Sequence, residues 1–375
     1  MVTRPTWAEI DLQAIKENIR AIRRRVGRNV KLIPAVKANA YGHGAVPVSR
    51  ACLEGGADML GVACVDEAAE LRRAGVSAPL IVLGCCELGA AEEIVRLEAI
   101  ATCCDLRFAK ALSEAAKKLG KTATVHVKID TGMGRIGIRP EEAVDFVRAI
   151  LALGNLNVDG VFTHFPSADE QDRSFTENQI AVFKRTVDSI CLECLLERAK
   201  ICVHASNSAA ILAYPQADFD AVRPGIMIYG IYPSKSVPRT ISIKECLTLK
   251  TRIVFLKKVP PGTPISYGRT YVTTEARLIA TLPVGYADGY SRRLSNCGEV
   301  VVKGVRVPVV GTVCMDQTMI DVTEVPGVDL GDEVILYGGG YECLSVSNIA
   351  EKIGTIPYEV LCNIGSRVRR IYLGS

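Results

Sequence analysis

Eight short runs of apolar and β-branched residues alternate with helical patterns through about the first 230 residues of the 375-residue chain. These runs predict strands at 31–36, 59–63, 80–83, 99–103, 122–129, 158–163, 201–204 and 221–228. Several are nearly continuous apolar runs, which is typical of strands buried on both faces. The segments between them, such as 65–74 and 107–119, carry Ala, Leu, Glu and Lys at helical spacing, with Asp66 and Asp105 as candidate caps. Eight strands alternating with helices predict a (β/α)8 TIM barrel. A doubly wound open sheet is the alternative, which is weaker because no G-x-G-x-x-G follows the first strand.

The sequence changes in character after Tyr232. Residues 233–238 (PSKSVP) resemble a linker. Beyond them, β-branched runs bounded by turns predict strands at 247–259, 277–283, 299–302, 307–313, 319–322 and 333–336, with one helix at 345–353. We therefore expect a barrel domain over 1–232, a linker over 233–238 and an antiparallel β domain over 239–375. Residues 6–11 are candidates to pair with the second domain.

Composition and charge exclude several classes of protein. Apolar residues make up 49% and charged residues 23% of the chain, as in ordinary globular proteins. The net charge of +4 is small, and no basic block with interleaved aromatic residues indicates nucleic-acid binding. No apolar run reaches the roughly 20 residues that span a bilayer, and the first eleven residues lack an apolar signal segment. We expect a cytoplasmic protein without a membrane partner.

Fourteen cysteines raise the question of a metal site or disulfides. Several are adjacent to one another or embedded in apolar runs: Cys64, Cys85, Cys86, Cys103, Cys104 and Cys202. Cys191 and Cys194 form one C-x-x-C pair, but no second pair follows at zinc-ribbon spacing. The sequence therefore favours buried free thiols that act as small hydrophobic residues, and no metal.

Polar residues gather where the predicted strands end, which is where barrels of this kind place their chemistry. These are Lys37 after the first strand, Lys128, Asp130 and Arg135 at the fifth, His164 at the sixth, His204, Asn207 and Ser208 at the seventh, and Arg223 on the eighth. Ser208 and Gly225 follow the seventh and eighth strands, the usual phosphate site of such barrels. Taken singly, each residue also has a structural interpretation, such as a solvated lysine or a loop histidine. His126 alternates with Lys128 and is predicted to be a hydrogen-bonded core histidine.

Seven sequence blocks carry a resemblance to a known family. They are 36–44 (VKANAYGHG), 128–137 (KIDTGMGRIG), 204–209 (HASNSA), 223–230 (RPGIMIYG), 265–271 (ISYGRTY), 282–290 (LPVGYADGY) and 314–318 (CMDQT). Together they resemble the alanine racemase family, fold-type-III enzymes that use pyridoxal 5'-phosphate (PLP). The similarity extends from Trp7 to Arg367. It implies an enzyme that interconverts L-alanine and D-alanine and supplies D-alanine for peptidoglycan.

The resemblance implies a two-base mechanism. Lys37 would bind PLP covalently and act as acid and base on one face of the substrate, and Tyr267 would act on the opposite face. A tyrosine needs a cationic, hydrogen-bonding environment for this, because its ordinary pKa is near 10. In the family, the tyrosine at this position bonds to the residue matching His164, which bonds to the one matching Arg223. Arg223 would also meet the pyridine nitrogen and leave it unprotonated, because a guanidinium keeps its proton.

The remaining implied roles concern binding and assembly. The residues that match cofactor binders are Tyr41, Ser208, Gly225, Ile226 and Tyr358. Those that match substrate binders are Arg135, Met315 and Asp316. Lys128 matches a position that is carbamylated in many members, and the substrate channel is matched by Tyr286 and Tyr358 at an inner gate and Asp169 near an outer one. In the family the residues matching Tyr267, Met315 and Asp316 come from the neighbouring subunit, which implies a head-to-tail homodimer.

Three alternatives stay open on the sequence alone. A racemase of the same design could act on serine, lysine or several amino acids, because no motif here defines the size of the pocket. A fold-type-III decarboxylase normally has a cysteine opposite the lysine, where this chain has Tyr267. A PLP homeostasis protein would lack the roughly 130 residues after the linker. One departure from the family pattern is Pro166, where alanine is common; it is expected to stiffen the loop after His164.

Overall fold

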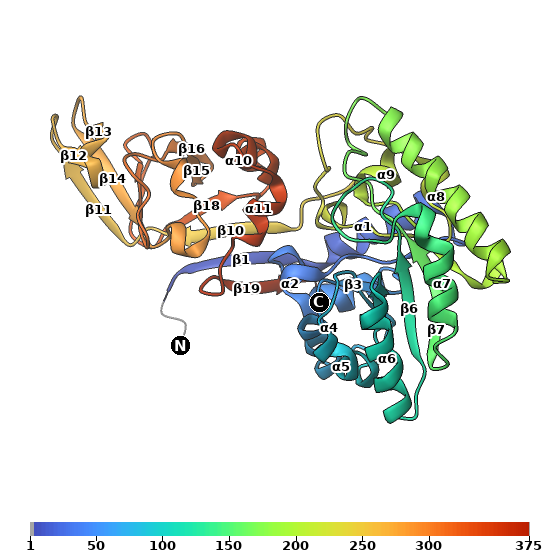
Figure 1. The fold of residues 1–375 in the computed structure, drawn as a ribbon. Coiled ribbons are helices and arrows are strands. Elements are labelled where there is room, and N and C mark those ends of the chain that lie inside the picture. The colour runs from blue at the N-terminus through green and yellow to red at the C-terminus, as the bar shows by residue number, and fades with distance from the viewer. Residues whose placement is uncertain (1–3, 375) are drawn as a thin grey trace. The chain divides into compact units, whose positions relative to one another are not determined.

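The computed structural model describes residues 4–374, which divide into two compact units (Figure 1). The barrel unit comprises residues 15–40 and 45–244. The β unit comprises residues 4–14, 41–44 and 245–374. Residues 4–14 therefore share a unit with the C-terminal part of the chain, although they precede the barrel in the sequence.

The barrel unit is built on one sheet of eight parallel strands. These are β2 (Lys31–Leu32), β3 (Leu60–Val62), β4 (Leu80–Val82), β5 (Ile100–Cys103), β6 (Ala123–Lys128), β7 (Leu156–Phe162), β8 (Cys202–His204) and β9 (Ala221–Val222). Their order is β2-β9-β8-β7-β6-β5-β4-β3, and a parallel bridge between Ala35 and Gly61 joins the two ends. A buried cluster that includes Ile33, Ile81 and Ile100 fills part of the interior. The predicted TIM barrel is confirmed.

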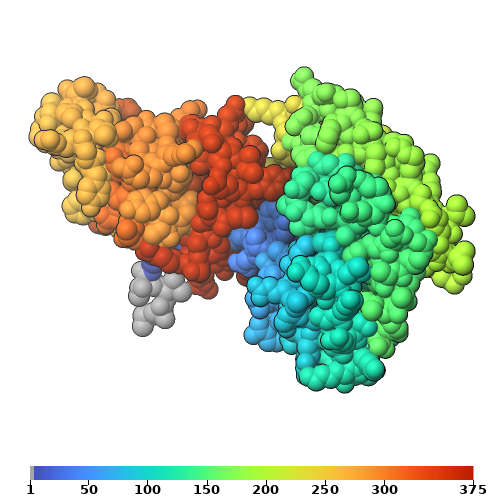
Figure 2. Space-filling view, viewed as in Figure 1, coloured from blue at the N-terminus to red at the C-terminus, as the bar shows by residue number. Residues whose placement is uncertain are grey.

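Helices alternate with these strands and form the surface of the barrel unit, as α6 and α8 do in Figures 1 and 2. They are α1 (Leu12–Val26), α3 (Ala45–Glu54), α4 (Val65–Arg73), α5 (Ala91–Arg96), α6 (Leu106–Lys118), α7 (Ala143–Leu151), α8 (Ser174–Glu193) and α9 (Ser208–Ala213). Asp105 caps α6 as predicted, since its carboxylate accepts the amide N–H of Arg107. Cys64, rather than Asp66, occupies the N-cap position of α4, and Asp66 lies in the first turn.

The β unit contains three antiparallel or mixed sheets. Its strands are β1 (Thr6–Asp11), β10 (Leu247–Arg252), β11 (Phe255–Val259), β12 (Pro264–Ile265), β13 (Tyr271–Val272), β14 (Arg277–Leu282), β15 (Glu299–Val302), β16 (Val305–Pro308), β17 (Thr318–Asp321), β18 (Glu333–Tyr337) and β19 (Arg369–Leu373). The largest sheet has the order β16-β15-β18-β10-β1-β19, while β11-β14-β17 and β12-β13 form the others. In this largest sheet β1 pairs with β10 and β19. The predominantly antiparallel fold expected of this region is confirmed. Two helices, α10 (Val346–Ile353) and α11 (Pro357–Cys362), complete the unit.

Several predicted strands were too long. The run 31–36, for example, forms a strand only at Lys31–Leu32. The run 221–228 forms a strand only at Ala221–Val222, and Ile226–Tyr229 is a 3-10 helix. Pro224 has no amide N–H to continue the ladder. The run 247–259 is broken at residues 253–254, because β10 pairs with β18 in one sheet and β11 pairs with β14 in another.

All fourteen cysteines are free thiols, but most are not buried. Cys52, Cys103, Cys202 and Cys246 are buried, whereas Cys64 is exposed at the start of α4. The interpretation of the cysteines as buried hydrophobic residues was therefore wrong for most of them. In the part of the chain that the structure describes, no three His, Cys, Asp or Glu side chains are grouped as metal ligands. No helix within residues 4–374 combines the length and apolar character needed to cross a membrane.

Candidate active site

Lys37 stands immediately before a left-handed turn. Lys37–Tyr41 forms the short element α2, and its φ angles are 52° at Ala38, Asn39 and Ala40 and 50° at Tyr41. None of these residues is glycine, and each left-handed L-residue costs about 1–2 kcal/mol. Backbone conformations of this kind persist only where surrounding contacts hold them, and they concentrate at functional sites.

Two side chains from the barrel unit hold this turn in place. Glu67 of α4 accepts the amide N–H of Ala38 with one carboxylate oxygen and that of Ala63 with the other, both at 2.7 Å. Asn39 accepts the amide N–H of Ala45 at 2.8 Å. The turn is thereby fixed to the end of β3 and to the start of α3, and the position of Lys37 at the rim follows from these contacts.

Arg223 lies inside the barrel among neutral histidines. The residue is 5% exposed, and its guanidinium contacts His204 Nδ1 at 2.5 Å and His164 Nδ1 at 3.2 Å. The carbonyl oxygens of Thr163 and Ala205 accept two further bonds, at 2.6 and 2.8 Å. Burial lowers the pKa of Arg223 to about 9, so it stays a cation at neutral pH. Burial, and then the charge of Arg223, holds the pKa of both histidines well below the ordinary value.

The tautomers of the histidines follow from their contacts with Arg223. A guanidinium only donates, so Nδ1 of His164 and Nδ1 of His204 must accept, and each ring carries its proton on Nε2. His204 Nε2 then donates to His126 Nδ1 at 2.8 Å, and His126 Nε2 faces Asp159 Oδ2 at 3.5 Å. His126 is fully buried, which confirms it as a hydrogen-bonded core histidine. His164 is left with an Nε2–H that can donate a hydrogen bond.

Lys128 ends β6 and is 3% exposed. Its Nζ lies 4.6 Å from the ring centroid of Phe162, and the same ring stacks on His204 at 4.7 Å. Burial, followed by the charges of Arg223 and Arg135, lowers the pKa of Lys128 well below its ordinary value. The amine is therefore held toward its neutral form, in which its lone pair is available.

The loop after β6 is shaped by Asp130. Its carboxylate accepts the amide N–H groups of Gly132 and Gly134 at 3.0 to 3.1 Å. A Cβ at Gly137 would lie 2.5 Å from the backbone nitrogen of Asp130, so the loop closes tightly on itself. Arg135, at the exposed side of this loop, contributes to the positive field at Lys128 and His164.

Ser208 organises a backbone cradle between the ends of β8 and β9. Its buried hydroxyl accepts the amide N–H of Gly225 at 2.8 Å and that of Met227 at 3.4 Å. Ile226, between them, is fully buried. Ser208, Gly225 and Ile226, which were predicted to bind a phosphate, thus lie at one place in the barrel unit. Asp169, the predicted outer gate, lies in the same unit, and its carbonyl accepts the Ser234 hydroxyl at 3.2 Å.

The β unit brings Tyr41 and Tyr358 together. Their ring centroids are 5.9 Å apart, with Tyr358 on α11. Burial, and then Tyr358 and Cys362, raises the pKa of Tyr41 above its ordinary value, so its hydroxyl stays protonated. A protonated phenol can donate to an anion.

Tyr267 lies in a strained turn at the surface of the β unit. The side chain is 73% exposed, and the preceding residue, Ser266, has a φ of 65°. The Ser266 hydroxyl donates to the carbonyl of Thr312 at 2.6 Å, and the Thr312 hydroxyl donates to the carbonyl of Tyr267 at 2.8 Å. These bonds attach the Tyr267 turn to the segment that leads into Cys314, Met315 and Asp316.

The turn that carries Tyr286 is tied to the same segment. The amide N–H of Tyr286 donates to the carbonyl of Cys314, and that of Ala287 to Met315, both at 3.1 Å. A Cβ at Gly285 would lie 2.2 Å from the Cys314 oxygen, so only glycine allows this approach. Tyr286 is 43% and Met315 53% exposed. Like Tyr267, they are exposed large side chains, and hydrogen bonds connect the turns that carry them.

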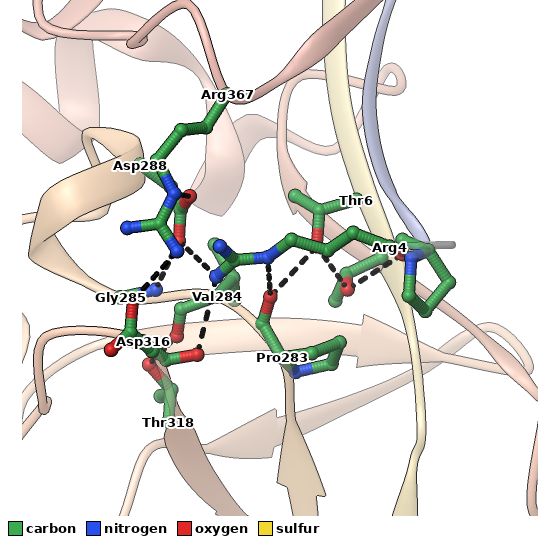
Figure 3. Close-up of polar contacts among 11 residues, drawn as sticks. Arg4, Thr6, Pro283, Val284, Gly285, Asp288, Asp316, Thr318 and Arg367 are labelled. Carbon is green, nitrogen blue, oxygen red and sulfur yellow. Dashed lines mark hydrogen bonds and ion pairs between the residues drawn. The ribbon is translucent and has the colours of Figure 1, made fainter. Parts of the chain in front are cut away.

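An ion-pair network holds Asp316 (Figure 3). Arg367 Nη2 contacts Asp316 Oδ1 at 2.7 Å, and Arg4 Nη2 donates to the Asp316 carbonyl at 3.3 Å. Both arginines also approach Asp288, which is 1% exposed, at 2.6 Å from Arg4 and 3.4 Å from Arg367. Asp288 in turn accepts the amide N–H of Gly285 at 3.0 Å, as Figure 3 shows. Neither Arg4 nor Asp288 was predicted as a site residue: Arg4 lies outside the seven blocks, and Asp288 lies within the block 282–290 without an assigned role.

Comparisons with known proteins agree with this architecture. The family model described as "Alanine racemase, N-terminal domain" matches residues 10–233, and "Alanine racemase, C-terminal domain" matches residues 246–372. The alanine racemase of Halothermothrix orenii is 49% identical over 375 residues, covering 99% of this chain and 97% of the relative.

Solved structures give the same result. The alanine racemase of Clostridium difficile 630 superposes with a TM-score of 0.93 at 40% identity, covering 99% of this chain and 96% of that one. The alanine racemase of Bartonella henselae, solved with covalently bound pyridoxal phosphate, superposes with a TM-score of 0.87 at 27% identity, covering 98% and 99%. The chain therefore belongs to the alanine racemase family of PLP-dependent isomerases.

Proposed function

We propose that this chain binds PLP in the barrel unit and racemises alanine with two bases on opposite faces of the substrate, Lys37 and Tyr267. The observation that carries this proposal is the buried Arg223, which donates to His164 Nδ1 and thereby leaves a proton on His164 Nε2. When bound, PLP supplies an electron sink that makes the substrate Cα–H acidic.

The residues present fit this cofactor. In the barrel unit a phosphate would meet the Ser208 hydroxyl and the amides beside Gly225 and Ile226. The resemblance to the family adds Tyr41, whose phenol stays protonated, and Tyr358, which packs beside Tyr41 in the β unit. Arg223 would meet the pyridine nitrogen and keep its own proton there. Lys37 would bind the cofactor covalently from the rim of the barrel.

The two proton transfers balance each other. One base removes the proton from Cα, and the other delivers a proton to the opposite face, so the product differs from the substrate only in configuration. A neutral His164 with its proton on Nε2 can donate to the Tyr267 oxygen, which favours the phenolate that a tyrosine base requires. Arg135, Met315 and Asp316 would bind the substrate carboxylate and line the site.

We also propose that Lys128 is carbamylated. Its neutral amine would attack carbon dioxide, forming a carbamate and releasing one proton, and the new negative charge would face Arg135 and Arg223. With carbon-13 bicarbonate, nuclear magnetic resonance should show an enriched carbamate signal that Lys128→Met abolishes. The same change at exposed Lys121 should leave the signal intact, and a signal that survives Lys128→Met would refute the assignment.

The activity is tested by incubating the purified protein with PLP and a panel of L-amino acids, followed by chiral chromatography. D-alanine should be the main new enantiomer. Release of carbon dioxide without any D-isomer would favour the decarboxylase alternative, whereas faster racemisation of serine or lysine would favour the broader racemase alternative.

The two-base assignment is tested in deuterated water. Tyr267→Phe should suppress exchange of Cα–H for one enantiomer of alanine much more than for the other, because only one face loses its base. Tyr271→Phe removes a nearby phenol and serves as the matched control. Equal loss for both enantiomers would contradict the assignment.

A head-to-tail homodimer with shared sites is proposed on the exposure of Tyr267, Tyr286 and Met315 on connected turns, since exposed patches of this kind mark interaction surfaces. Mixing Lys37→Ala and Tyr267→Phe subunits should restore about one quarter of the sites, because half of the dimers are mixed and each mixed dimer has one intact site. If both residues came from one chain, mixing would restore none.

The biological role is proposed to be supply of D-alanine for peptidoglycan. Deletion of the gene should then make growth depend on added D-alanine, whereas a catabolic role would leave growth on rich medium unchanged. Cytoplasmic location stays a prediction from the sequence, to be checked by cell fractionation.

A further inference from the structure

Five cysteines gather at the carboxyl ends of three consecutive barrel strands. They are Cys64 after β3, Cys85 and Cys86 after β4, and Cys103 and Cys104 at the end of β5. The racemase mechanism uses none of them. Their position at the ends of neighbouring strands brings thiols that are far apart in the sequence into one region of the barrel unit.

Within this group, Cys85 and Cys104 are in contact. Their Sγ atoms are 3.3 Å apart, although 19 residues separate them in the chain. The contact follows from the sheet, because Val82 of β4 pairs with Ala101 of β5 and the same register continued by three residues sets Cys85 opposite Cys104. Adjacent strands lie about 4.8 Å apart, inside the Cα–Cα range of about 4.4–6.8 Å that a disulfide requires. The two Sγ atoms, now 3.3 Å apart, must approach to about 2 Å to form a bond.

A small molecule can reach this pair. Cys85 and Cys104 both line a cavity of about 510 Å³ in the barrel unit, and the volume lies within the range of ordinary ligand pockets. Leu88 and Phe108 form part of its wall, and Arg107 adds a positive charge. Cys85 is exposed, whereas Cys104 is partly buried.

We propose that Cys85 and Cys104 form a dithiol modification site that reacts with low-molecular-weight disulfides to give an intrachain disulfide. The Cys85 thiolate attacks one sulfur of the small disulfide, forming a mixed disulfide and releasing the first thiolate. Cys104 loses its proton to water and attacks the Cys85 sulfur, releasing the second thiolate. Each released thiolate takes up a proton. Two protein thiols are oxidised, and one small disulfide is reduced to two thiols.

The order of attack follows from the surroundings of the two thiols. Burial, and then the contact with Cys85, raises the pKa of Cys104 to about 12. Cys104 is therefore a slow first nucleophile, but it stands next to Cys85 and acts once the mixed disulfide has formed. Burial also raises the pKa of Cys86 to about 11, which disfavours the other thiol in the cavity as the first attacker.

The site borders the proposed catalytic rim. Cys103 of β5 pairs with Val127 of β6, so Cys104 is opposite Lys128 in the same register. The chemistry of the pair does not depend on the racemase activity, so failure of one proposal leaves the other standing.

The test uses the holoenzyme and oxidised glutathione. After native incubation, peptide mapping should find Cys85 linked to Cys104. Two free thiols should be lost, no glutathione should remain on either cysteine, and dithiothreitol should restore both thiols. Cys86→Ser and Cys297→Ser should give the same linked peptide, because Cys297 is exposed in the β unit and Cys86 is not part of the pair. Cys85→Ser should abolish the link.

Several outcomes would overturn the proposal. They are glutathione retained on Cys85 without a crosslink, a crosslink from Cys85 to Cys86 or Cys64, or full retention of both thiols. If Cys85→Ser fails to fold, a trivalent arsenical that bridges two close thiols provides a second measurement on the unmodified chain. Protection of Cys85 and Cys104 together from alkylation by the arsenical supports the pair, and protection of another pair alone contradicts it.

Discussion

Replacement of Glu67 by alanine should release the left-handed turn that follows Lys37. One carboxylate accepts the amide N–H groups of Ala38 and Ala63, both at 2.7 Å, so the substitution removes two charge-assisted hydrogen bonds. Such bonds contribute about 1.5–3 kcal/mol each. The bond to Ala38 is exposed and contributes at the low end of that range, so the loss of both bonds should lower the free energy of unfolding by about 3–4.5 kcal/mol.

The functional loss should exceed what the stability loss explains. Four consecutive left-handed residues store about 4 kcal/mol or more of unfavourable backbone energy, which the contacts of Glu67 and Asn39 offset. Without Glu67 the turn is expected to relax toward allowed conformations and carry Lys37 away from its place at the rim. The folded variant should therefore retain much less PLP than the parent.

Two measurements distinguish these effects. Urea unfolding reports stability, and the visible absorbance of bound PLP in gel-filtered folded protein reports the position of Lys37. Glu67→Gln keeps one acceptor oxygen and should lie between parent and alanine variant, while Glu70→Ala, at an exposed position of the same helix, should change neither. Unchanged urea midpoint and unchanged PLP content in Glu67→Ala would refute the reasoning.

Three further predictions concern other parts of the chain. Burial raises the pKa of Asp218 to about 6, so the folded state binds the proton of this carboxyl group more tightly than the unfolded state does. The contribution of Asp218 to the free energy of unfolding should therefore fall by about 3 kcal/mol as the pH rises from about 4 to about 6, and it should stay constant above pH 6. Urea unfolding of Asp218→Asn across this range should lack that fall. Gly285→Ala places a Cβ 2.2 Å from a carbonyl oxygen and should lower both kcat and the melting temperature, whereas Gly89→Ala, with open space around it, should not. Arg4→Met removes a donor from the buried Asp288 and should cost about 1–3 kcal/mol in thermal unfolding.

The barrel could be predicted because its signal is local. Each strand is a short apolar run that can be recognised from its own residues alone. The cap at Asp105 depends only on the amide of Arg107, two residues later. The end of the eighth strand was misplaced because apolar residues continue past Pro224, and hydrophobicity does not register the missing amide.

The contacts that position the site could not be predicted in the same way. Ala38, Asn39 and Ala40 carry no preference for a left-handed turn strong enough to identify it, and the carboxylate that holds them lies 29 residues away. Asp288 and Arg4 are 284 residues apart in the sequence. Only the folded chain brings such groups together, so their roles can be identified from tertiary contacts but not from the sequence.

The charges around His164 bear on the choice of substrate. Besides burial, the charges of Arg223, Arg135 and Lys37 lower its pKa, and Lys128 acts in the same direction only while it is unmodified and protonated. The nearest carboxylate in the loop, Asp130, is already engaged by two backbone amides. Such a field favours a phosphate and a substrate carboxylate, and it opposes a second positive charge. A substrate with a cationic side chain would bring that charge into the same field, which argues against lysine and for a small neutral amino acid. Serine is neutral too, so only the size and polarity of the pocket can separate it from alanine.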